Sequence, residues 1–180
     1  VDETGKPRIE ALMTEVFPSL DLIQYYEKNA EKILRDQSAP TPMLLMGKKS
    51  KIYYEPLGPV LIISPWNYPL SLAAGDTIPA LLAGNAVLQK PDNQTALTAL
   101  FALDLARQAG LPEGLWQMVL GRGSAIGPAL IEEADYVMFT GSTASGRGIA
   151  AEAARRLVDS SMELGGKNAM LVLDDADLDR

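Results

Sequence analysis

Hydrophobic residues in this chain change their rhythm at about residue 57. Beyond that point, short apolar runs alternate with longer stretches in which apolar side chains recur every three or four positions. Consecutive apolar positions suit strands that are buried on both faces, and the stretches between them have the spacing of helices. The alternation predicts an α/β fold in which helices cover a parallel sheet. The predicted strands are GPVLIIS, NAVLQK, WQMVL, DYVMF and NAMLVL at 168–173, and the predicted helices span about residues 69–83, 95–109, 124–132 and 144–157.

The first part of the chain has two other patterns. Residues 8–35 carry apolar side chains at helical spacing, and Pro18 should bend or split that helix because proline has no backbone N–H to donate. We expect the helix to cover a face of the sheet. SAPTP at 38–42 ends this pattern, and residues 43–55 predict a hairpin of two short strands about a turn at 47–50. An exposed hairpin of this kind can pair with another chain.

Small and polar residues follow the predicted strands at the positions where each strand ends. In a parallel sheet the carboxyl ends of the strands lie at one edge, and ligands bind there. The sequence therefore predicts a binding edge. Its segments are PWNYP (65–69), KPDNQT (90–95), GRGSAIG (121–127) and TGSTASG (140–146).

Two of these segments are rich in glycine, and each has two interpretations. GRGSAIG, with Gly123 and Gly127, stands where a phosphate-binding loop would stand, but its glycines also suit a tight turn between a strand and a helix. Gly141 and Ser142 precede a predicted helix whose free N–H groups either bind an anion or are capped by the serine. The lysine and hydroxyl residue of a nucleoside-triphosphate loop do not follow GSTASG, which argues against a nucleotide triphosphatase.

Three polar side chains at the strand ends are candidates for chemistry. Lys90 ends a buried strand, where a cation needs an anion or a path to solvent. Asn67 carries an amide that can donate to an oxyanion, although asparagine also suits the turn before Tyr68. Glu163 lies just before Gly165–Gly166, which allow close approach of a ligand; it is either a general base or an exposed acid at a strand end.

The composition is that of one globular domain, with 180 residues of which 47% are hydrophobic and 22% charged. A net charge of −7 argues against nucleic acid as a partner. The chain has no cysteine, no metal-binding motif and no apolar run near the roughly 20 residues that cross a bilayer. Its polar start is unlike a signal peptide, so we expect a cytoplasmic protein without membrane contact. The chain stops at DDADLDR just after an apolar run, which suggests a piece of a longer protein.

Taken in order, five segments resemble the N-terminal, cofactor-binding portion of the aldehyde dehydrogenase superfamily, from about residue 8 to 180: PWNYP, AGNAVLQKPDNQT, GLPEGLWQMVLG, MFTGSTASGRGIA and MELGGKNAMLV. The sequence around these segments is similar to that of succinate-semialdehyde dehydrogenases. The resemblance implies a truncated, Rossmann-like NAD(P)-binding domain over residues 1–180, with an oligomerisation hairpin at 43–55 and the catalytic domain absent. It also implies a homo-oligomeric enzyme that oxidises an aldehyde, such as succinate semialdehyde, with NAD or NADP.

The resemblance assigns roles to individual residues. Asn67 would donate its side-chain amide to the thiohemiacetal oxyanion, and Glu163 would act as general base toward water, a task that partial burial would favour. Lys90 would bind the adenosine ribose or a phosphate on it. The other cofactor contacts would come from Ser64, Pro65 and Trp66 along the channel, Gly123 and Gly127 at the adenine end, Ser142 with Gly141 at the pyrophosphate, and Leu164 near the nicotinamide.

The family's nucleophile is a cysteine a few dozen residues after the ELGG glutamate, and this sequence stops before that point, at Arg180. The 180 residues alone are therefore predicted to be inactive. Asn93 stands where NAD-preferring members have an acid that bonds the ribose, so we expect NADP to be accepted. The alternatives are a non-catalytic nucleotide-binding module and an interaction role for the 43–55 hairpin.

Overall fold

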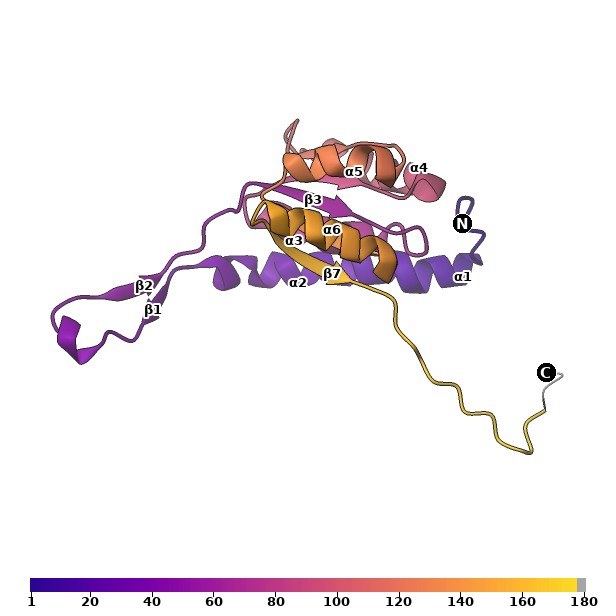
Figure 1. Ribbon diagram of the computed structural model, residues 1–180, viewed down its shortest axis with the longest axis horizontal. Coiled ribbons are helices and arrows are strands. Elements are labelled where there is room, and N and C mark those ends of the chain that lie inside the picture. Colours follow the sequence, from indigo (N-terminus) through magenta and orange to yellow (C-terminus); the bar gives the residue numbers. More distant parts are fainter. Residues whose placement is uncertain (178–180) are drawn as a thin grey trace.

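The computed structural model describes residues 1–177, and its centre is a five-stranded parallel sheet (Figure 1). The strands are β3 (Pro59–Ile63), β4 (Ala86–Lys90), β5 (Trp116–Met118), β6 (Tyr136–Thr140) and β7 (Asp159–Glu163). They lie in the order β5-β4-β3-β6-β7. In the central strand, Leu61 and Ile62 are fully buried although they face opposite sides. The predicted α/β fold is confirmed, and burial on both faces explains its apolar strands.

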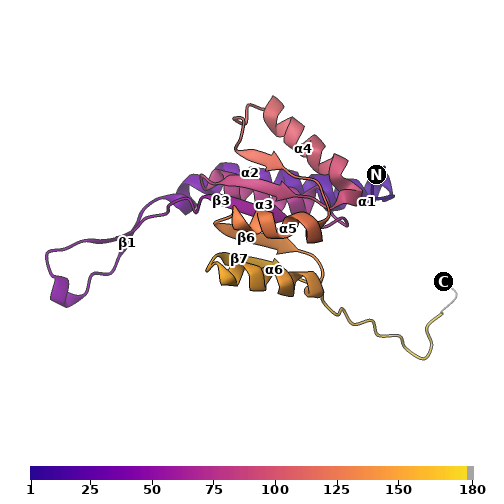
Figure 2. The same cartoon turned by 45° about the horizontal axis from the view of Figure 1, so that its top comes forward.

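Two pairs of helices cover the two faces of the sheet (Figure 2). They are α3 (Ser71–Leu82) and α4 (Ala96–Gln108) on one face, and α5 (Gly123–Glu132) and α6 (Thr143–Arg155) on the other. Val60 and Ile62 pack with Leu103 of α4, whereas Leu61 packs with Ile131 of α5. The alternation along β3 thus supplies both cores, and the four predicted helices are confirmed.

The N-terminal helix is continuous but irregular. It consists of α1 (Arg8–Ala11), a π-helical turn (Leu12–Val16) and α2 (Phe17–Leu34). Because Pro18 has no N–H for the usual bond to the fourth residue before it, the preceding turn widens instead of breaking. The helix packs against α3, so it forms an outer layer and does not cover the sheet directly as expected. Neither α2 nor any other helix in residues 1–177 is both long and apolar enough to cross a membrane.

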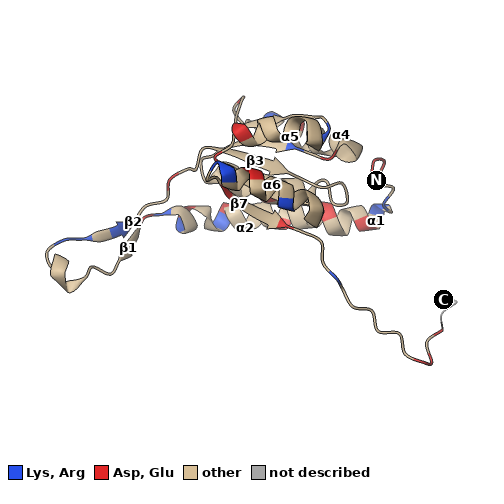
Figure 3. Cartoon of the chain, viewed as in Figure 1, with Lys and Arg blue, Asp and Glu red and all other residues tan. Residues whose placement is uncertain are grey.

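The hairpin exists, but its predicted first strand is wrong. The antiparallel strands are β1 (Gln37–Ala39) and β2 (Ser50–Ile52), so pairing begins before residue 43. A short 3-10 turn, Met43–Leu45, forms the tip instead. Pro42, at the start of this turn, has no N–H to donate to a neighbouring strand. Leu44 is 97% exposed, so no described residue covers the apolar run that suggested a strand. The hairpin projects from the body as an arm with basic residues along its β2 side (Figure 3).

The predicted last strand, 168–173, is also wrong. The fifth strand of the sheet is β7, whose sequence DSSME is polar because its side chains lie at the sheet edge and are exposed or half-buried. Residues 164–174 have no regular structure, and Met170 and Leu171 are nearly fully exposed. The chain leaves the body after β7 (Figure 1). Glu163 is therefore the last residue of a strand, at the carboxyl edge.

Candidate functional site

The order of the strands reverses at β3, and this opens a crevice at the carboxyl edge. From β3 the chain adds β4 and β5 on one side, then returns to the other side of β3 with β6 and β7. The register pairs Ile63 of β3 with Lys90 of β4 and with Phe139 of β6, so these strands end together. The connections that follow β3 and β6 diverge, and open α/β sheets bind ligands at such a point.

A cleft of about 560 Å³ lies over the ends of β3, β6 and β7, and we call it the Glu163 cleft. It brings together the two predicted catalytic residues, Asn67 and Glu163, with most of the residues predicted to contact the pyrophosphate and nicotinamide. The predicted residues that line it are Pro65, Trp66, Asn67, Gly141, Ser142, Glu163 and Leu164; the additional ones are Leu72, Asp76, Met138, Thr140 and Gly165.

A second cavity of about 420 Å³, the Lys90 cavity, lies over the ends of β3, β4 and β6, between α5 and α6. It collects the residues predicted for the adenine end, Lys90, Gly123 and Gly127. Its other lining residues are Ile63, Asp92, Ser124, Phe139, Ser145, Gly148 and Ile149. The two cavities share one edge of the sheet, and the loop after β6 lies between them.

Lys90 is a buried cation with few polar partners. Its side chain donates one hydrogen bond, from Nζ to the Pro91 carbonyl at 2.9 Å, and within residues 1–177 it has no ion-pair partner. Burial lowers the pKa of Lys90, and the charge of Asp92 partly opposes this. Its remaining donors can serve a group placed in the Lys90 cavity, such as a hydroxyl or an anion.

Two predicted cofactor residues line neither cavity. Ser64 is buried, its N–H donates to the Lys90 carbonyl at 3.2 Å and its hydroxyl accepts a bond from Gln89 at 3.4 Å. Asn93 is exposed and its Oδ1 accepts a bond from the Gly121 N–H at 3.3 Å. Ser64 therefore joins the ends of β3 and β4, while Asn93 lies on the rim beside the loop before α5.

The loop after β6 is held tightly, and glycine is required there for packing. The Gly141 N–H donates to the Glu163 carbonyl at 3.0 Å, and a Cβ at this position would lie 2.6 Å from the Phe139 ring. Ser142 caps α6, because its Oγ accepts a bond from the Ser145 N–H at 3.2 Å. The capping interpretation of Ser142 is thus confirmed, and the exposed residue also lines the Glu163 cleft.

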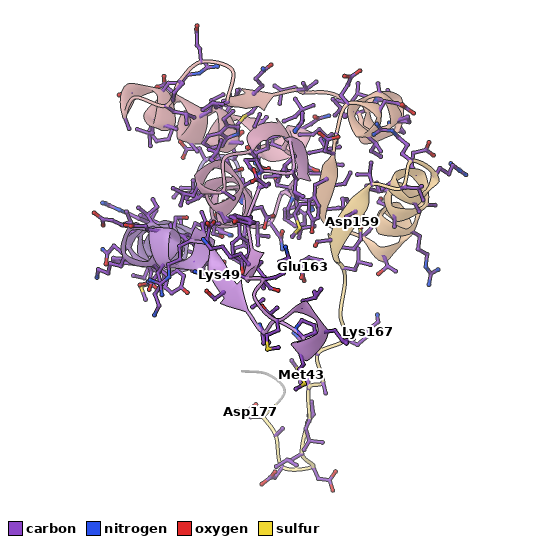
Figure 4. The ribbon with its side chains drawn as sticks, turned by 90° about the vertical axis from the view of Figure 1, so that its left-hand side faces the viewer. Met43, Lys49, Asp159, Glu163, Lys167 and Asp177 are labelled. Carbon is purple, nitrogen blue, oxygen red and sulfur yellow. The ribbon has the colours of Figure 1, made fainter. Side chains whose placement is uncertain are left out.

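Two carboxyl groups line the Glu163 cleft, and they come from different elements. Glu163 lies at the end of β7, with Asp159 at the other end of the strand (Figure 4), and it is exposed, so residues 1–177 do not provide the partial burial that we expected. Asp76 reaches the cleft from α3 and is half-buried. Burial, and secondly the charge of Glu163, raise the pKa of Asp76 to about 6.

Sequence reasoning missed Asp76, although a signal was present. The predicted site residues follow strands, whereas Asp76 lies in the second turn of a helix. It is the only charged residue in α3, whose other residues are apolar or small and uncharged. An isolated acid in such a helix is costly to bury, and this marks it as a candidate.

The comparisons with known proteins agree on one family. The family model described as "Aldehyde dehydrogenase family" matches residues 1–180. A Mycolicibacterium smegmatis protein named "Putative succinate-semialdehyde dehydrogenase (NADP+)" is 47% identical over 178 residues, which cover 98% of this chain and 34% of that protein. The 4,4'-diapolycopene aldehyde oxidase of a Methylomonas species is 43% identical, with the same shares covered.

A solved structure shows the same arrangement of the chain. The NAD+ complex of an aldehyde dehydrogenase from Bacillus cereus superimposes with a TM-score of 0.86 at 33% identity. The match covers 98% of this chain and 36% of that one. The chain thus spans about a third of the length of the relatives that it matches.

Proposed function

Because this chain belongs to the aldehyde dehydrogenase family, we propose that it forms the NAD(P)-binding portion of a longer enzyme that oxidises an aldehyde to the carboxylic acid. The observation that carries this proposal is the Glu163 cleft, where an amide, Asn67, and a carboxylate, Glu163, meet at the point of strand reversal. The Lys90 cavity beside it supplies a buried cation. This combination suits a ligand with a reactive end and an anionic or hydroxyl-rich end.

The residues present fit a dinucleotide. The Lys90 ammonium group has donors to spare in its cavity, and Gly123 and Gly127 add no side chain to the adjoining helix start. We propose that Lys90 binds the adenosine ribose, that Ser142 and Gly141 lie at the pyrophosphate, and that Leu164 lies near the nicotinamide. When bound, the dinucleotide accepts hydride from the substrate.

We propose that the chain's own chemistry is oxyanion stabilisation and proton removal. The Asn67 amide would donate to the oxygen that becomes negative when a thiolate attacks the aldehyde. The Glu163 carboxylate would take a proton from the water that later hydrolyses the thioester. The thiolate itself would come from the remainder of the enzyme, since residues 1–180 contain no cysteine.

For the cofactor, we propose that NADP is accepted. The neutral Asn93 lies on the rim near Lys90, and an acid there would repel a 2′-phosphate. The name of the M. smegmatis relative includes NADP+, whereas the B. cereus structure is an NAD+ complex, so each relative supports one of the two cofactors. In the complete gene product, Asn93→Glu should weaken NADP binding about tenfold, because the new carboxylate repels the 2′-phosphate, and it should not weaken NAD binding, since an acid at this position can bond the ribose. Unchanged NADP affinity in titrations of both cofactors would contradict this proposal.

For the substrate, we propose a semialdehyde such as succinate semialdehyde. The support is the name of the M. smegmatis relative. The Methylomonas relative, at nearly the same identity, is named for a carotenoid aldehyde, so this part of the chain does not discriminate between the two. The test is reduction of NAD or NADP by the complete gene product with a panel of aldehydes, in which acidic short-chain aldehydes should have the highest kcat/KM. The 180 residues alone should produce no NADPH with any of them.

We also propose that the arm formed by β1 and β2 joins copies of the enzyme in a cytoplasmic homo-oligomer. The support is its projection from the body and its tip, where Met43 and Leu44 are 87% and 97% exposed. Apolar side chains exposed to this extent are typical of surfaces that are covered by a partner.

A further inference from the structure

The N-terminal helix reaches back to the loop that carries Asn67. Glu15, in the π-helical turn, is 5% exposed, and both of its carboxylate oxygens are occupied. Oε2 accepts a hydrogen bond from the Leu70 N–H at 2.7 Å, and Oε1 accepts one from Lys6 Nζ at 2.9 Å. A buried acid fifty-five positions away in sequence thus binds the backbone three residues after Asn67.

Lys6 holds the same loop through a second contact. Its ammonium group lies 3.7 Å from the centre of the Tyr68 ring, and its side chain is 12% exposed. A cation over an aromatic face is attracted by the ring, more strongly when water is excluded. Lys6 and Glu15, which we call the Lys6–Glu15 clamp, therefore hold residues 68 and 70.

The clamp also replaces a local helix cap. Leu70 is the residue before α3, and no side chain near it in sequence caps the helix. An N–H at a helix start needs an acceptor, and a carboxylate is favoured there by the helix dipole. In a capping box, a Glu or Gln at the third position of the helix accepts the bond from the N–H of the residue before the helix, but that position is Ala73 in α3. Here the acceptor comes from another element, so the loop and the N-terminal helix are fixed relative to each other.

The other end of the loop is fixed as well, and Asn67 lies between the two ends. Ser64 is bound to the end of β4 through its N–H and hydroxyl. Within residues 1–177, the Asn67 side chain has no hydrogen-bond partner that would orient it, although it lines the Glu163 cleft. Its position is therefore determined by the backbone of residues 64–70.

We propose that Glu15 and Lys6 are positioning residues that hold the Asn67 amide where the oxyanion develops. This inference rests on the proposed function, in which Asn67 is the oxyanion donor. A buried ion pair contributes little net stability, and its better-supported use is to specify one arrangement of the groups around it. Positioning matters here because small displacements of a preorganised donor are costly to the rate.

The test is a double-mutant cycle in the complete gene product. Asn67→Ala should lower kcat about 100-fold or more, as loss of one oxyanion donor does. Glu15→Ala should lower kcat about tenfold in the wild-type background, because it displaces the donor without removing it, and less than about twofold in the Asn67→Ala background. KM and cofactor affinity should change little in both variants. Glu15→Gln, which keeps an acceptor for the Leu70 N–H, should recover most of the lost rate.

A matched control separates positioning from general destabilisation. Ser19→Ala removes a buried hydrogen bond from the same helix, between Ser19 Oγ and the Glu15 carbonyl, without touching the carboxylate. It should lower the melting temperature but leave kcat unchanged. Equal losses for Glu15→Ala in both backgrounds, or a Glu15→Gln variant as slow as Glu15→Ala, would overturn the inference. An unchanged kcat for Asn67→Ala would instead overturn the proposed function on which it rests.

Discussion

The Glu163 cleft and the Lys90 cavity open at the same edge of one sheet, yet they differ in charge, because within residues 1–177 two acids and no cation line the cleft whereas Lys90 and Asp92 line the cavity. The cleft holds two carboxyl groups, exposed Glu163 at the end of β7 and half-buried Asp76 in α3. The cavity holds a buried ammonium group, Lys90, beside the glycine-rich start of α5. A carboxylate suits proton removal, and a buried cation suits a ribose or phosphate. Proton removal and cofactor binding thus belong to separate regions of one edge, so variants of the two regions should affect different kinetic constants.

The largest effect should come from Glu163. In the complete gene product, Glu163→Gln removes the base but keeps the shape of the side chain, so kcat should fall about 100- to 10,000-fold, the usual contribution of a general base. Cofactor affinity, measured by fluorescence titration, should stay within about twofold. Asp159→Asn, at the other end of β7, is the matched control and should leave kcat unchanged (Figure 4). A cofactor affinity that falls together with kcat would remove the distinction between the two regions.

Lys90 should show the opposite behaviour. Lys90→Met keeps the apolar stem and removes the donor, so the Kd for NADP should rise about 10- to 100-fold, as expected for a hydrogen bond from a charged group. The rate at saturating cofactor should change less than about threefold. Because burial already disfavours the charge on Lys90, the variant should be at least as stable as the wild type in a thermal melt. Lys49→Met, on the exposed arm, is the control and should leave both quantities unchanged (Figure 4). Equal affinity in Lys90→Met would contradict the assignment of the cavity.

The smallest effect concerns stability, through Asp76. Its pKa is raised in the folded state from 3.8 to about 6, so the unfolded chain releases this proton at lower pH than the folded one. Folding stability should therefore decline as the pH rises from about 4 to about 6 and then stay level, as linkage requires. Asp76→Asn removes this penalty and should stabilise the protein by about 1–2 kcal/mol at pH 8, after allowance for solvent around the half-buried side chain, and by almost nothing at pH 4.

Urea unfolding at the two pH values measures this difference. Asp104→Asn, on the exposed side of α4, is the control for the exchange of a carboxylate for an amide away from the cleft. If Asp76→Asn raises the free energy of unfolding equally at pH 4 and pH 8, then packing, and not charge, limits the stability of α3.

The sequence predicted those parts of the fold in which burial determines the positions of the apolar residues. β3, β4 and β6 are apolar on both faces, and this requires helices on both sides of the sheet. β7 was missed because an edge strand is held by backbone bonds to β6, which leave no apolar signature. The run at 168–173 was taken for a strand because it is apolar, although within residues 1–177 nothing covers it.

The residues of the candidate site also fall into two groups, those that the sequence predicted and those that it missed. Asn67, Lys90 and Glu163 follow strands, and a parallel topology alone brings strand ends together. The sequence prediction missed Asp76 because helix α3 carries it over the cleft. It missed Glu15 because the contact of Glu15 with Leu70 joins distant parts of the chain. Packing between elements determines both placements; the sequence marks Asp76 only as an isolated acid in an uncharged helix, and it does not show which element Asp76 or Glu15 contacts.

The most direct test of the roles proposed for Asn67 and Glu163 is a rapid-mixing measurement of NADPH formation by the Glu163→Gln form of the complete gene product. If Asn67 supports hydride release and Glu163 serves only the later hydrolysis, one equivalent of NADPH per active site should form rapidly, and further NADPH should appear only at the lowered kcat of the variant. Continuous NADPH production at the wild-type rate, or no initial formation of NADPH by a variant that still binds NADP, would contradict this division of roles.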